Sequence, residues 1–375
     1  MKIALVGPVF PYRGGISLYN TLLYRELSKE HNVQAINFRR LYPEILFPGK
    51  SQYDENQRFF DTPSFRELDS INPLSWFRVA RRVATFKPDL VIFQFWMPFF
   101  APCMGTLLRS VKRLWDCNSI IICHNIVPHE GSPVDKFLTK YMFKYADGYI
   151  LHAHSMKHDL LNINFGAKYR YNPHPIYDIF GDKIDKSQAR KELGIESENV
   201  ILYFGYIRRY KGVQYLIEAL PKALRSIDFM TMIVGEFYES KEKYLNLIES
   251  KGIRDKIMLI DKYIPDSEVN LYFSAADIVV LPYISATQSG IVQIAISYNL
   301  PCIVTDVGGL PEVVLDGTTG YIVPPSNPDA LSQSISDFFK ESDRQQLEEN
   351  IIAERDKYSW GKLVGNILQL YKEIR

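Results

Sequence analysis

Three cationic side chains, Arg208, Arg209 and Lys211, stand close together in the segment GYIRRYKG, residues 205–212. The segment follows a short apolar run and leads into VQYLIEAL, which has the apolar spacing of a helix. Free N–H groups at a helix amino terminus, the helix dipole and nearby positive charges all attract an anion. The segment is therefore a candidate phosphate site, although a solvated basic turn would have the same composition.

A second candidate phosphate site lies in TQSGIVQIAISYNLPCIVTDVGGLPEVV, residues 287–314. Ser289 can cap the helix that begins at Gly290, and Gly290 has no side chain to hold a ligand away from N–H groups such as that of Ile291. The Gly-Gly turn at 308–309 permits either an N–H concavity or simply a tight turn. Loops of this kind after successive strands favour a diphosphate as the ligand.

The elements that must position these loops alternate between strand and helix, twice over. Short apolar runs, separated by segments with helical periodicity, occur at 3–7, 33–38, 90–95, 120–124 and 149–152, and again at 200–204, 230–235, 257–260, 278–283 and 301–305. Runs that are apolar throughout and linked by helices imply parallel sheets covered on both faces. We expect an α/β protein with two Rossmann-like units, whose strand carboxyl ends carry the site.

The alternation breaks at NPHPIYDIFGDKIDKSQ, residues 172–188, where turn-forming residues give way to a charged stretch. We place a domain boundary there, with a first domain at 1–175 and a second at 176–359. The last segment, 360–375, has a helical apolar stripe that could pack against either domain.

Composition narrows the function classes. The chain has 375 residues, 46% of them hydrophobic, and a formal net charge of +1. These values indicate a folded protein of two domains and argue against nucleic acid as a partner. The amino-terminal segment lacks the features of a signal peptide, and no run approaches the roughly 18 apolar residues of a spanning helix. The four cysteines have neither paired nor metal-ligand spacing, so we expect reduced core thiols in a cytoplasmic protein.

Taken together, these segments resemble the retaining nucleotide-sugar glycosyltransferases of family 4, the glycosyl transferases group 1, which have the GT-B architecture. The matching segments are PYRGG at 11–15, CHN at 123–125, GYIRRYKG, IVGE at 233–236, LPY at 281–283 and NLPCIVTDVGGLPEVV at 299–314. The resemblance covers nearly the whole chain and is most specific between residues 205 and 314. It implies two facing Rossmann-like domains and a final helix that crosses back onto the first.

The resemblance also implies what each domain binds. The second domain would hold a nucleotide-sugar donor, and the first would contact a glycan or lipid-linked acceptor. Donor contacts would come from Gly14, Gly15, Gly205, Glu236, Ser289, Gly290, Ile291 and Glu312. His124 occupies the family's position for a histidine near the reacting sugar, and a hydrogen-bonded histidine at a strand end is the alternative. His129 and Glu130, in NIVPHEGS, are candidate acceptor contacts.

The chemistry that this arrangement suits is the departure of a diphosphate from an anomeric carbon. Negative charge builds on the leaving oxygen, and Arg208, Lys211 and the N–H groups at 289–291 are our candidates to stabilise it. The family needs no metal for this step, and no Asp-x-Asp pair occurs in the chain. We therefore expect no metal or other cofactor. Retention in the family is thought to proceed by same-face attack, assisted by the leaving phosphate.

The chain departs from the family pattern at the donor site. Ala286 and Ile294 stand where the family usually has two glutamates, and Tyr206 stands where it usually has an arginine. Arg208 or Arg209 could supply that charge from two or three residues further on. These changes put the identity of the donor in doubt more than the class of reaction.

Three functions stay open. A glycosyltransferase of surface polysaccharide, lipopolysaccharide or a related glycan is the leading hypothesis. A nucleotide-sugar 2-epimerase would use the same fold and donor site, and a non-catalytic nucleotide-sugar-binding scaffold would account for the missing glutamates.

The aromatic and basic stretch at 95–115 suits either contact with the inner face of a membrane or a core helix with a basic outer face.

Overall fold

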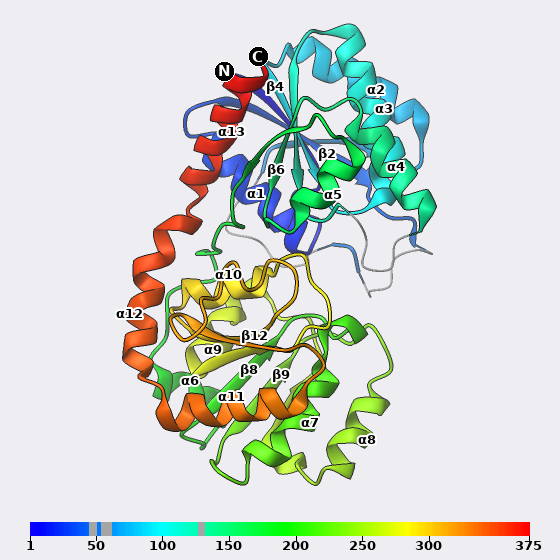
Figure 1. Cartoon of the computed structure of the whole chain (residues 1–375). Coiled ribbons are helices and arrows are strands. Elements are labelled where there is room, and N and C mark those ends of the chain that lie inside the picture. The colour runs from blue at the N-terminus through cyan, green and yellow to red at the C-terminus, as the bar shows by residue number, and fades with distance from the viewer. Residues whose placement is uncertain (45–50, 54–61, 127–131) are drawn as a thin grey trace. The chain divides into compact units, whose positions relative to one another are not determined.

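The computed structural model describes residues 1–44, 51–53, 62–126 and 132–375, which form two units (Figure 1). The first unit contains Met1–Pro173 and Ser359–Arg375, and the second contains His174–Tyr358. The chain thus divides inside the segment 172–188, and its last residues return to the first unit.

The first unit is built on a seven-stranded parallel sheet with the order β3-β2-β1-β4-β5-β6-β7. Its strands are β1 (Lys2–Val6), β2 (Asn32–Arg40), β3 (Ser64–Asp69), β4 (Leu90–Phe95), β5 (Asn118–Cys123), β6 (Gly148–Leu151) and β7 (Lys168–Tyr171). The strand order reverses between β1 and β4. Ligands of doubly wound sheets bind at such a switch point, beyond the carboxyl ends of the strands.

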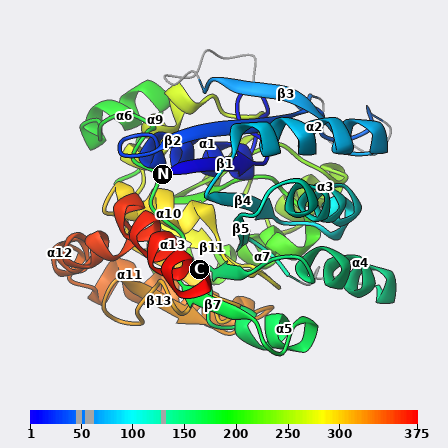
Figure 2. The same ribbon diagram turned by 90° about the horizontal axis from the view of Figure 1, so that it is seen from above.

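Helices cover both faces of this sheet (Figures 1 and 2). They are α1 (Gly15–Leu27), α2 (Pro73–Phe86), α3 (Ala101–Leu114), α4 (Pro133–Phe143), α5 (Met156–Ile163) and α13 (Trp360–Ile374), with a 3-10 turn η2 at Pro98–Phe100. Helices α2, α3 and α4 pack side by side on one face, and α1 packs with α13 on the other. The β-branched and aromatic residues of β4 and β5 are buried on both faces, as expected of central parallel strands.

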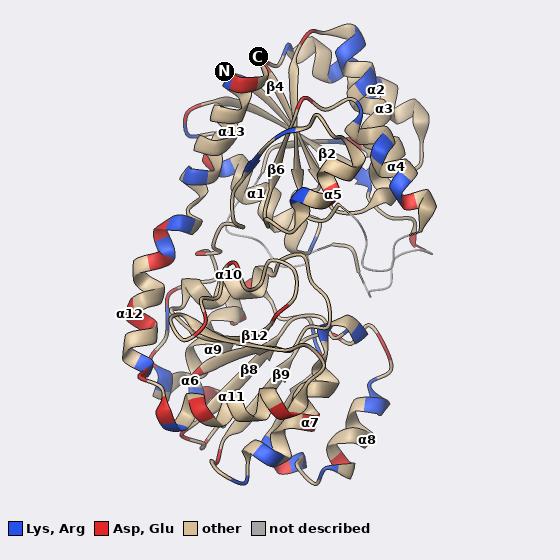
Figure 3. Ribbon diagram, in the orientation of Figure 1, with Lys and Arg blue, Asp and Glu red and all other residues tan. Residues whose placement is uncertain are grey.

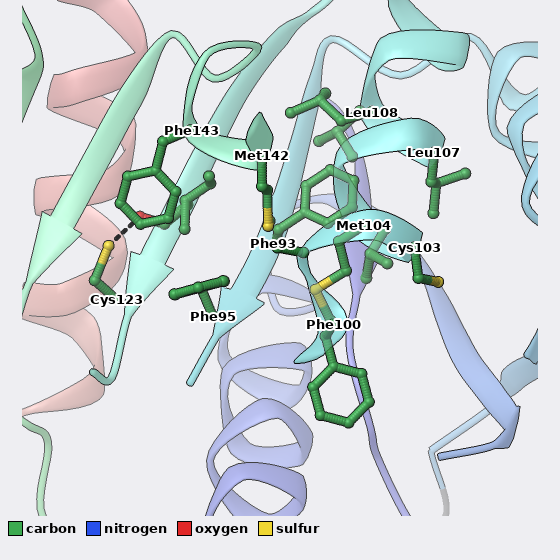
Figure 4. Close-up of a cluster of buried hydrophobic side chains, with 14 of the residues drawn as sticks. Phe93, Phe95, Phe100, Cys103, Met104, Leu107, Leu108, Cys123, Met142 and Phe143 are labelled. Carbon is green, nitrogen blue, oxygen red and sulfur yellow. Dashed lines mark hydrogen bonds between the residues drawn. The ribbon is translucent and has the colours of Figure 1, made fainter. Parts of the chain in front are cut away.

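The core of the first unit lies between the sheet and the α2–α4 layer (Figure 4). Phe93 and Phe95 of β4 pack there against Phe100 of η2 and Met104 of α3, and all four are fully buried. Each buried aromatic side chain of this kind contributes about 1.5–3 kcal/mol by leaving water. This packing fixes the end of β4, and with it the loops of the switch point.

The second unit repeats the plan with a six-stranded parallel sheet, in the order β10-β9-β8-β11-β12-β13. Its strands are β8 (Val200–Phe204), β9 (Met230–Val234), β10 (Ile257–Ile260), β11 (Ile278–Leu281), β12 (Cys302–Thr305) and β13 (Gly320–Val323). Its helices are α6 (Lys186–Leu193), α7 (Val213–Ala223), α8 (Glu242–Ser250), α9 (Val269–Ala275), α10 (Gly290–Ser297), α11 (Pro328–Glu341) and α12 (Arg344–Glu354), with a 3-10 turn η3 at Arg209–Lys211. Here the strand order reverses between β8 and β11.

The closing helix α13 is held to the first sheet by polar bonds at its outer edge. Asn366 Nδ2 donates to Asn172 Oδ1 at 2.9 Å, and Arg170 pairs with Glu373 at 2.5 Å. The crossing of the final helix back onto the first domain is therefore confirmed.

All ten apolar runs that predict strands are strands in the structure. The prediction missed β3, β7 and β13, which are all edge strands. The sequences SFRELD and KYRY of β3 and β7 are polar and largely solvent-accessible, because an edge strand has a neighbour on one side alone. Such strands carry no continuous apolar signal.

Candidate functional site

The cationic loop of the second unit begins directly after β8, at the switch point of the sheet. Gly212 closes it with φ 68°, and a Cβ atom at that position would lie 1.8 Å from the carbonyl oxygen of Pro282. Ile284 N also donates to Tyr210 O at 2.8 Å. The loop after β8 is therefore bound along its backbone to the loop after β11, at a distance that a side chain would prevent.

Lys211 points from this loop toward the start of α10. Its Nζ lies 3.8 Å from the ring centre of Tyr283, and the Tyr283 hydroxyl lies 3.4 Å from Ser289 Oγ. Ser289 Oγ in turn accepts from Ile291 N at 3.3 Å, as the predicted cap requires. The structure thus joins the ammonium group and the helix amino terminus through one buried aromatic ring.

The electrostatics of the loop favour an anion. Burial, with a smaller contribution from the positive charge of Arg208, lowers the pKa of Lys211 to about 8. Among the residues that the structure describes, neither Arg208 nor Lys211 forms an ion pair with a carboxylate. A bound phosphate would offset the burial of the Lys211 ammonium and the positive charge of Arg208 beside it.

Arg208 and Tyr206 both lie against the loop that follows β9. The Arg208 guanidinium is 4.6 Å from the ring centre of Tyr238, and the Tyr206 ring is 4.6 Å from the same ring. The arginine that the family carries directly after Gly205 is thus replaced by an aromatic pair with a guanidinium beside it. Position 206 itself supplies no positive charge.

Gly308, in the loop after β12, brings a fourth segment to this edge. It has φ 54°, and a Cβ atom there would lie 1.7 Å from Ala286 O. Gly309 N also donates to Thr287 O at 2.9 Å. The Gly-Gly turn therefore supports the loop that leads into α10, which is one of the two roles that its sequence allowed.

Two glutamates, and two apolar residues that stand where the family usually has glutamates, complete this edge. Glu236 is buried, with its backbone oxygen accepting from Ile207 N at 2.9 Å, and Glu312 is half-buried. Ala286 and Ile294, which replace the family's glutamates, are both buried apolar side chains. A carboxylate at either place would need its own buried partner, so their loss removes two hydrogen-bond acceptors and two negative charges.

The predicted residues of the first unit lie at its own switch point. Gly14 precedes α1 with φ 105°, and a Cβ atom at Gly14 or Gly15 would have no described atom within 4 Å. His124 follows β5 and is buried, with Nε2 2.8 Å from Gln94 Oε1. The Tyr19 ring packs against His124 at a right angle, with ring centres 4.6 Å apart.

The remaining first-unit predictions have different outcomes. His129 and Glu130 lie outside the described residues. In the stretch 95–115, Phe95 and Phe100 are core residues and Lys112 pairs with Asp147 at 2.6 Å. The core-helix interpretation of this stretch therefore fits the structure. Trp96, Phe99 and Trp115 are half-buried, and membrane contact stays a prediction.

Several residues that build the two clusters were missed by the sequence prediction. Gln94 and Tyr19 contact His124, Asn20 contacts Gln94, and Tyr283 and Tyr238 lie against the two cations. Gln94 carries a usable signal, because it is the one polar residue in LVIFQF, a run that is otherwise apolar. The tyrosines carry none, since aromatic residues are common in any core.

The sequence predicted reduced core thiols and no set of metal ligands. All four cysteines are free thiols, three of them buried and Cys117 half-buried. In the described ranges no three His, Cys, Asp or Glu side chains are grouped so that they could hold a metal ion. Within the same ranges, no helix has the length and apolarity needed to cross a bilayer.

Comparison with known families matches both units. The model of the glycosyl transferases group 1 matches residues 185–354, and that of the Glycosyltransferase Family 4 matches residues 13–176. Among curated proteins, an uncharacterized glycosyltransferase of Methanocaldococcus jannaschii is 28% identical over 201 residues, which are 52% of this chain and 50% of that protein. The chain spans about half the length of the first curated relatives that it matches.

Two solved structures share the fold over the whole chain. Sucrose-phosphate synthase from Thermosynechococcus elongatus has a TM-score of 0.75 at 18% identity, covering 100% of this chain and 98% of its own. The Anabaena HepE protein in complex with UDP has a TM-score of 0.76 at 14% identity, covering 100% of both chains. At these identities the likeness shows the fold, which is of the GT-B type.

Proposed function

The chain belongs to the group 1 glycosyltransferases of GT-B fold, and from that premise we propose that it transfers a sugar from a nucleotide-sugar donor to a glycan or lipid-linked acceptor. The observation that carries the proposal is the cluster of Arg208, Lys211 and the capped start of α10 at the switch point of the second sheet. HepE, a structural neighbour, has been crystallised with UDP and with UDP-glucose, which supports a nucleotide-sugar donor.

In this proposal the second unit binds the diphosphate of the donor. Arg208 and Lys211 approach it as cations, while the N–H groups at 289–291 and Gly205 allow close backbone contact. Glu236 and Glu312 bind hydroxyl groups of the donor. As the bond to the anomeric carbon breaks, these donors and cations stabilise charge on the leaving oxygen and no metal is needed.

The first unit provides the acceptor side. Gly14 and Gly15 leave room for the diphosphate or the acceptor, and His124 contacts a hydroxyl near the reacting carbon. Attack from the face of the departing phosphate retains the anomeric configuration, so no carboxylate nucleophile of the kind used by retaining glycosidases is required. The acceptor belongs to a cell-surface polysaccharide or a related glycan.

The buried Ala286 and Ile294 alter which sugar the site accepts. Without two carboxylates, the site loses acceptors for sugar or ribose hydroxyls and leaves the phosphate contacts in place. An epimerase and a binding scaffold are the alternatives that this change would otherwise suggest. The family match does not favour either.

We further propose contact with the inner face of a membrane through the outer surface of helices α2, α3 and α4. These helices contain three, three and two Lys or Arg, respectively, and Asp135 is their one acidic residue (Figure 3). Leu74, Phe77, Val134 and Phe137 are 75%, 49%, 63% and 71% exposed on α2 and α4. Exposed apolar side chains among cations fit an anionic bilayer, where both kinds of residue gain free energy.

A thermal-shift screen tests the donor proposal. The purified chain would be heated with UDP, GDP, ADP, CMP and dTDP and their common sugars, each with Mg²⁺ or with EDTA. A ligand at about 100 times its Kd contributes roughly 2.7 kcal/mol to stability. We expect one nucleotide family to raise Tm independently of metal, and Lys211→Ala to abolish the shift. A chain that responds to no nucleotide would contradict the proposal and favour a scaffold.

Turnover separates the enzyme classes. Sugar transferred to an acceptor, with its anomeric configuration read by NMR coupling constants, identifies a retaining transferase. Donor that is isomerised in the absence of acceptor would instead identify an epimerase.

A further inference from the structure

The polar side chains around His124 form a chain of hydrogen bonds with a fixed direction. Asn20 Nδ2 lies 3.2 Å from Pro8 O, Gln94 Nε2 lies 3.0 Å from Asn20 Oδ1, and His124 Nε2 lies 2.8 Å from Gln94 Oε1. Asn20 and Gln94 are fully buried, so their amide groups must be satisfied by these partners.

The carbonyl of Pro8 sets the direction of every bond in this chain. A carbonyl oxygen accepts and never donates, so Asn20 turns its NH₂ group to Pro8 and its oxygen to Gln94. Gln94 must then donate to Asn20 through Nε2, which leaves Gln94 Oε1 facing His124. An amide oxygen also accepts only, and therefore His124 Nε2 carries a proton.

We propose that Asn20 and Gln94 are positioning residues that hold the neutral His124 ring in the Nε2–H tautomer. Its Nδ1, which is buried in this structure, then carries the lone pair and can only accept a hydrogen bond. This inference rests on the proposed function and adds to it which ring nitrogen of His124 carries the proton and which accepts a hydrogen bond. A substrate hydroxyl that reaches Nδ1 of the neutral ring is therefore bound as the donor.

A second buried histidine provides an internal comparison. His152 Nδ1 lies 2.8 Å from the backbone oxygen of Asn172, which again can only accept. The neutral His152 ring is therefore the Nδ1–H tautomer, opposite to that of His124. The two ring centres are 5.3 Å apart, and Tyr19 packs against both.

Long-range ¹H–¹⁵N correlation spectra of the full-length ¹⁵N-labelled protein test the tautomers without any substrate. At a pH where both rings are neutral, we expect a protonated Nε2 on His124 and a protonated Nδ1 on His152, each assigned by its loss in a His→Gln variant. In Gln94→Met, which keeps the volume and removes both hydrogen bonds, the His124 signals should show a mixture of tautomers. A wild-type His124 that carries its proton on Nδ1 would overturn the inference.

Gln94→Glu tests whether the tautomer matters for the reaction. A carboxylate beside Nε2 stabilises the imidazolium, so the pKa of His124 should rise by about 1–3 units and its Nδ1 should become a donor near neutral pH. The acidic limb of kcat/KM should move to higher pH by the same amount. A purely structural role would lower kcat/KM at every pH and leave the limb in place.

The two measurements distinguish failure of the proposed function from failure of the role given to Asn20 and Gln94. If no donor is turned over, the proposed function fails while the spectra still decide the tautomer. If transfer occurs and the limb does not move in Gln94→Glu, the glycosyltransferase stands and the role given to the Asn20–Gln94 chain is wrong. Should Gln94→Glu fail to fold, Gln94→Met retains the spectroscopic test.

Discussion

Lys211 and Tyr283 form a cation–aromatic contact in which Nζ lies 3.8 Å from the ring centre. The ring hydroxyl reaches Ser289, the cap of α10, so the contact connects the two loops that the sequence suggested for phosphate binding. Cation–π contacts hold a desolvated ammonium group without neutralising it. Lys211 therefore keeps its charge available to a ligand, at the cost of a lowered pKa.

The lowered pKa of Lys211 predicts how nucleotide affinity depends on pH. Binding of a diphosphate favours the charged ammonium, so affinity should be constant below about pH 8 and fall above it. Between pH 7 and 9 the association constant for the preferred nucleoside diphosphate should drop by up to about tenfold. Over that range the Lys211 ammonium of the free protein loses most of its protons. The terminal phosphate, with a pKa near 6, stays ionised throughout this range. Calorimetric titration at several pH values measures the effect.

Lys211→Arg is the matched control, because a guanidinium stays protonated over the whole range. The variant should bind with an affinity that does not change between pH 7 and 9. If wild type and Lys211→Arg lose affinity in parallel, Lys211 does not contact the phosphate.

Ser289 should contribute to both stability and binding. Ser289→Ala removes the side chain that accepts from Ile291 N and should lower the free energy of unfolding by about 1 kcal/mol, whereas Ser289→Gly should cost only a few tenths. Asn327→Ala removes the cap of α11, where Asn327 Oδ1 accepts from Ala330 N, and serves as the control. It should lower stability to a similar extent while leaving nucleotide affinity unchanged, as urea unfolding and titration would show.

Much of this architecture could be predicted because its signals are local. The strands of both sheet centres are continuous apolar runs, and the caps and cations of the donor-side loops are adjacent in sequence to those strands. The Asn20–Gln94–His124 chain could not be predicted, since its members are separated by 74 and 30 residues and meet only when β4 pairs with β5 and α1 lies beside them. The contact between Tyr283 and Lys211 could not be predicted for the same reason. The membrane hypothesis began from an aromatic stretch in which Phe95 and Phe100 lie in the core.

Gly212 should tolerate no side chain, for a reason that goes beyond its backbone angle. Gly212 and Gly194 share a φ of 68°, but a Cβ atom at Gly212 would lie 1.8 Å from Pro282 O, while one at Gly194 would meet nothing within 4 Å. Gly194→Ala should therefore cost about 1–2 kcal/mol, the usual penalty of the left-handed conformation. Gly212→Ala should lower Tm substantially further and weaken nucleotide binding. Equal losses in the two variants would show that the loops after β8 and β11 separate without cost.

His152 should make the first unit sensitive to acid. Burial, partly opposed by its bond to the Asn172 carbonyl, lowers its pKa from 6.5 to about 4. Between those values the unfolded chain binds a proton that the folded chain does not, so stability falls as the pH decreases from about 6.5 to 4. The loss should reach about 3 kcal/mol. His152→Asn, whose amide can still donate to Asn172 O, should remove this pH dependence. His158→Asn, at a side chain that is 83% exposed, should leave it unchanged.

Vesicle binding tests the outer surface of α4. The chain should sediment with vesicles that contain anionic lipid and remain in solution with neutral vesicles, because each Lys or Arg near an anionic surface contributes about 1 kcal/mol. Lys136→Gln combined with Lys140→Gln should therefore reduce the partition coefficient roughly 30-fold. Phe137→Ser should weaken binding at any salt concentration, since its contribution is apolar, whereas raising the salt should weaken only the part that depends on lysine.

Ile352→Ser, at an exposed apolar residue of α12, is the control and should have no effect. Sedimentation that is equal for neutral and anionic vesicles, or that survives the double lysine replacement, would mean that charge on this layer does not direct the protein to a membrane.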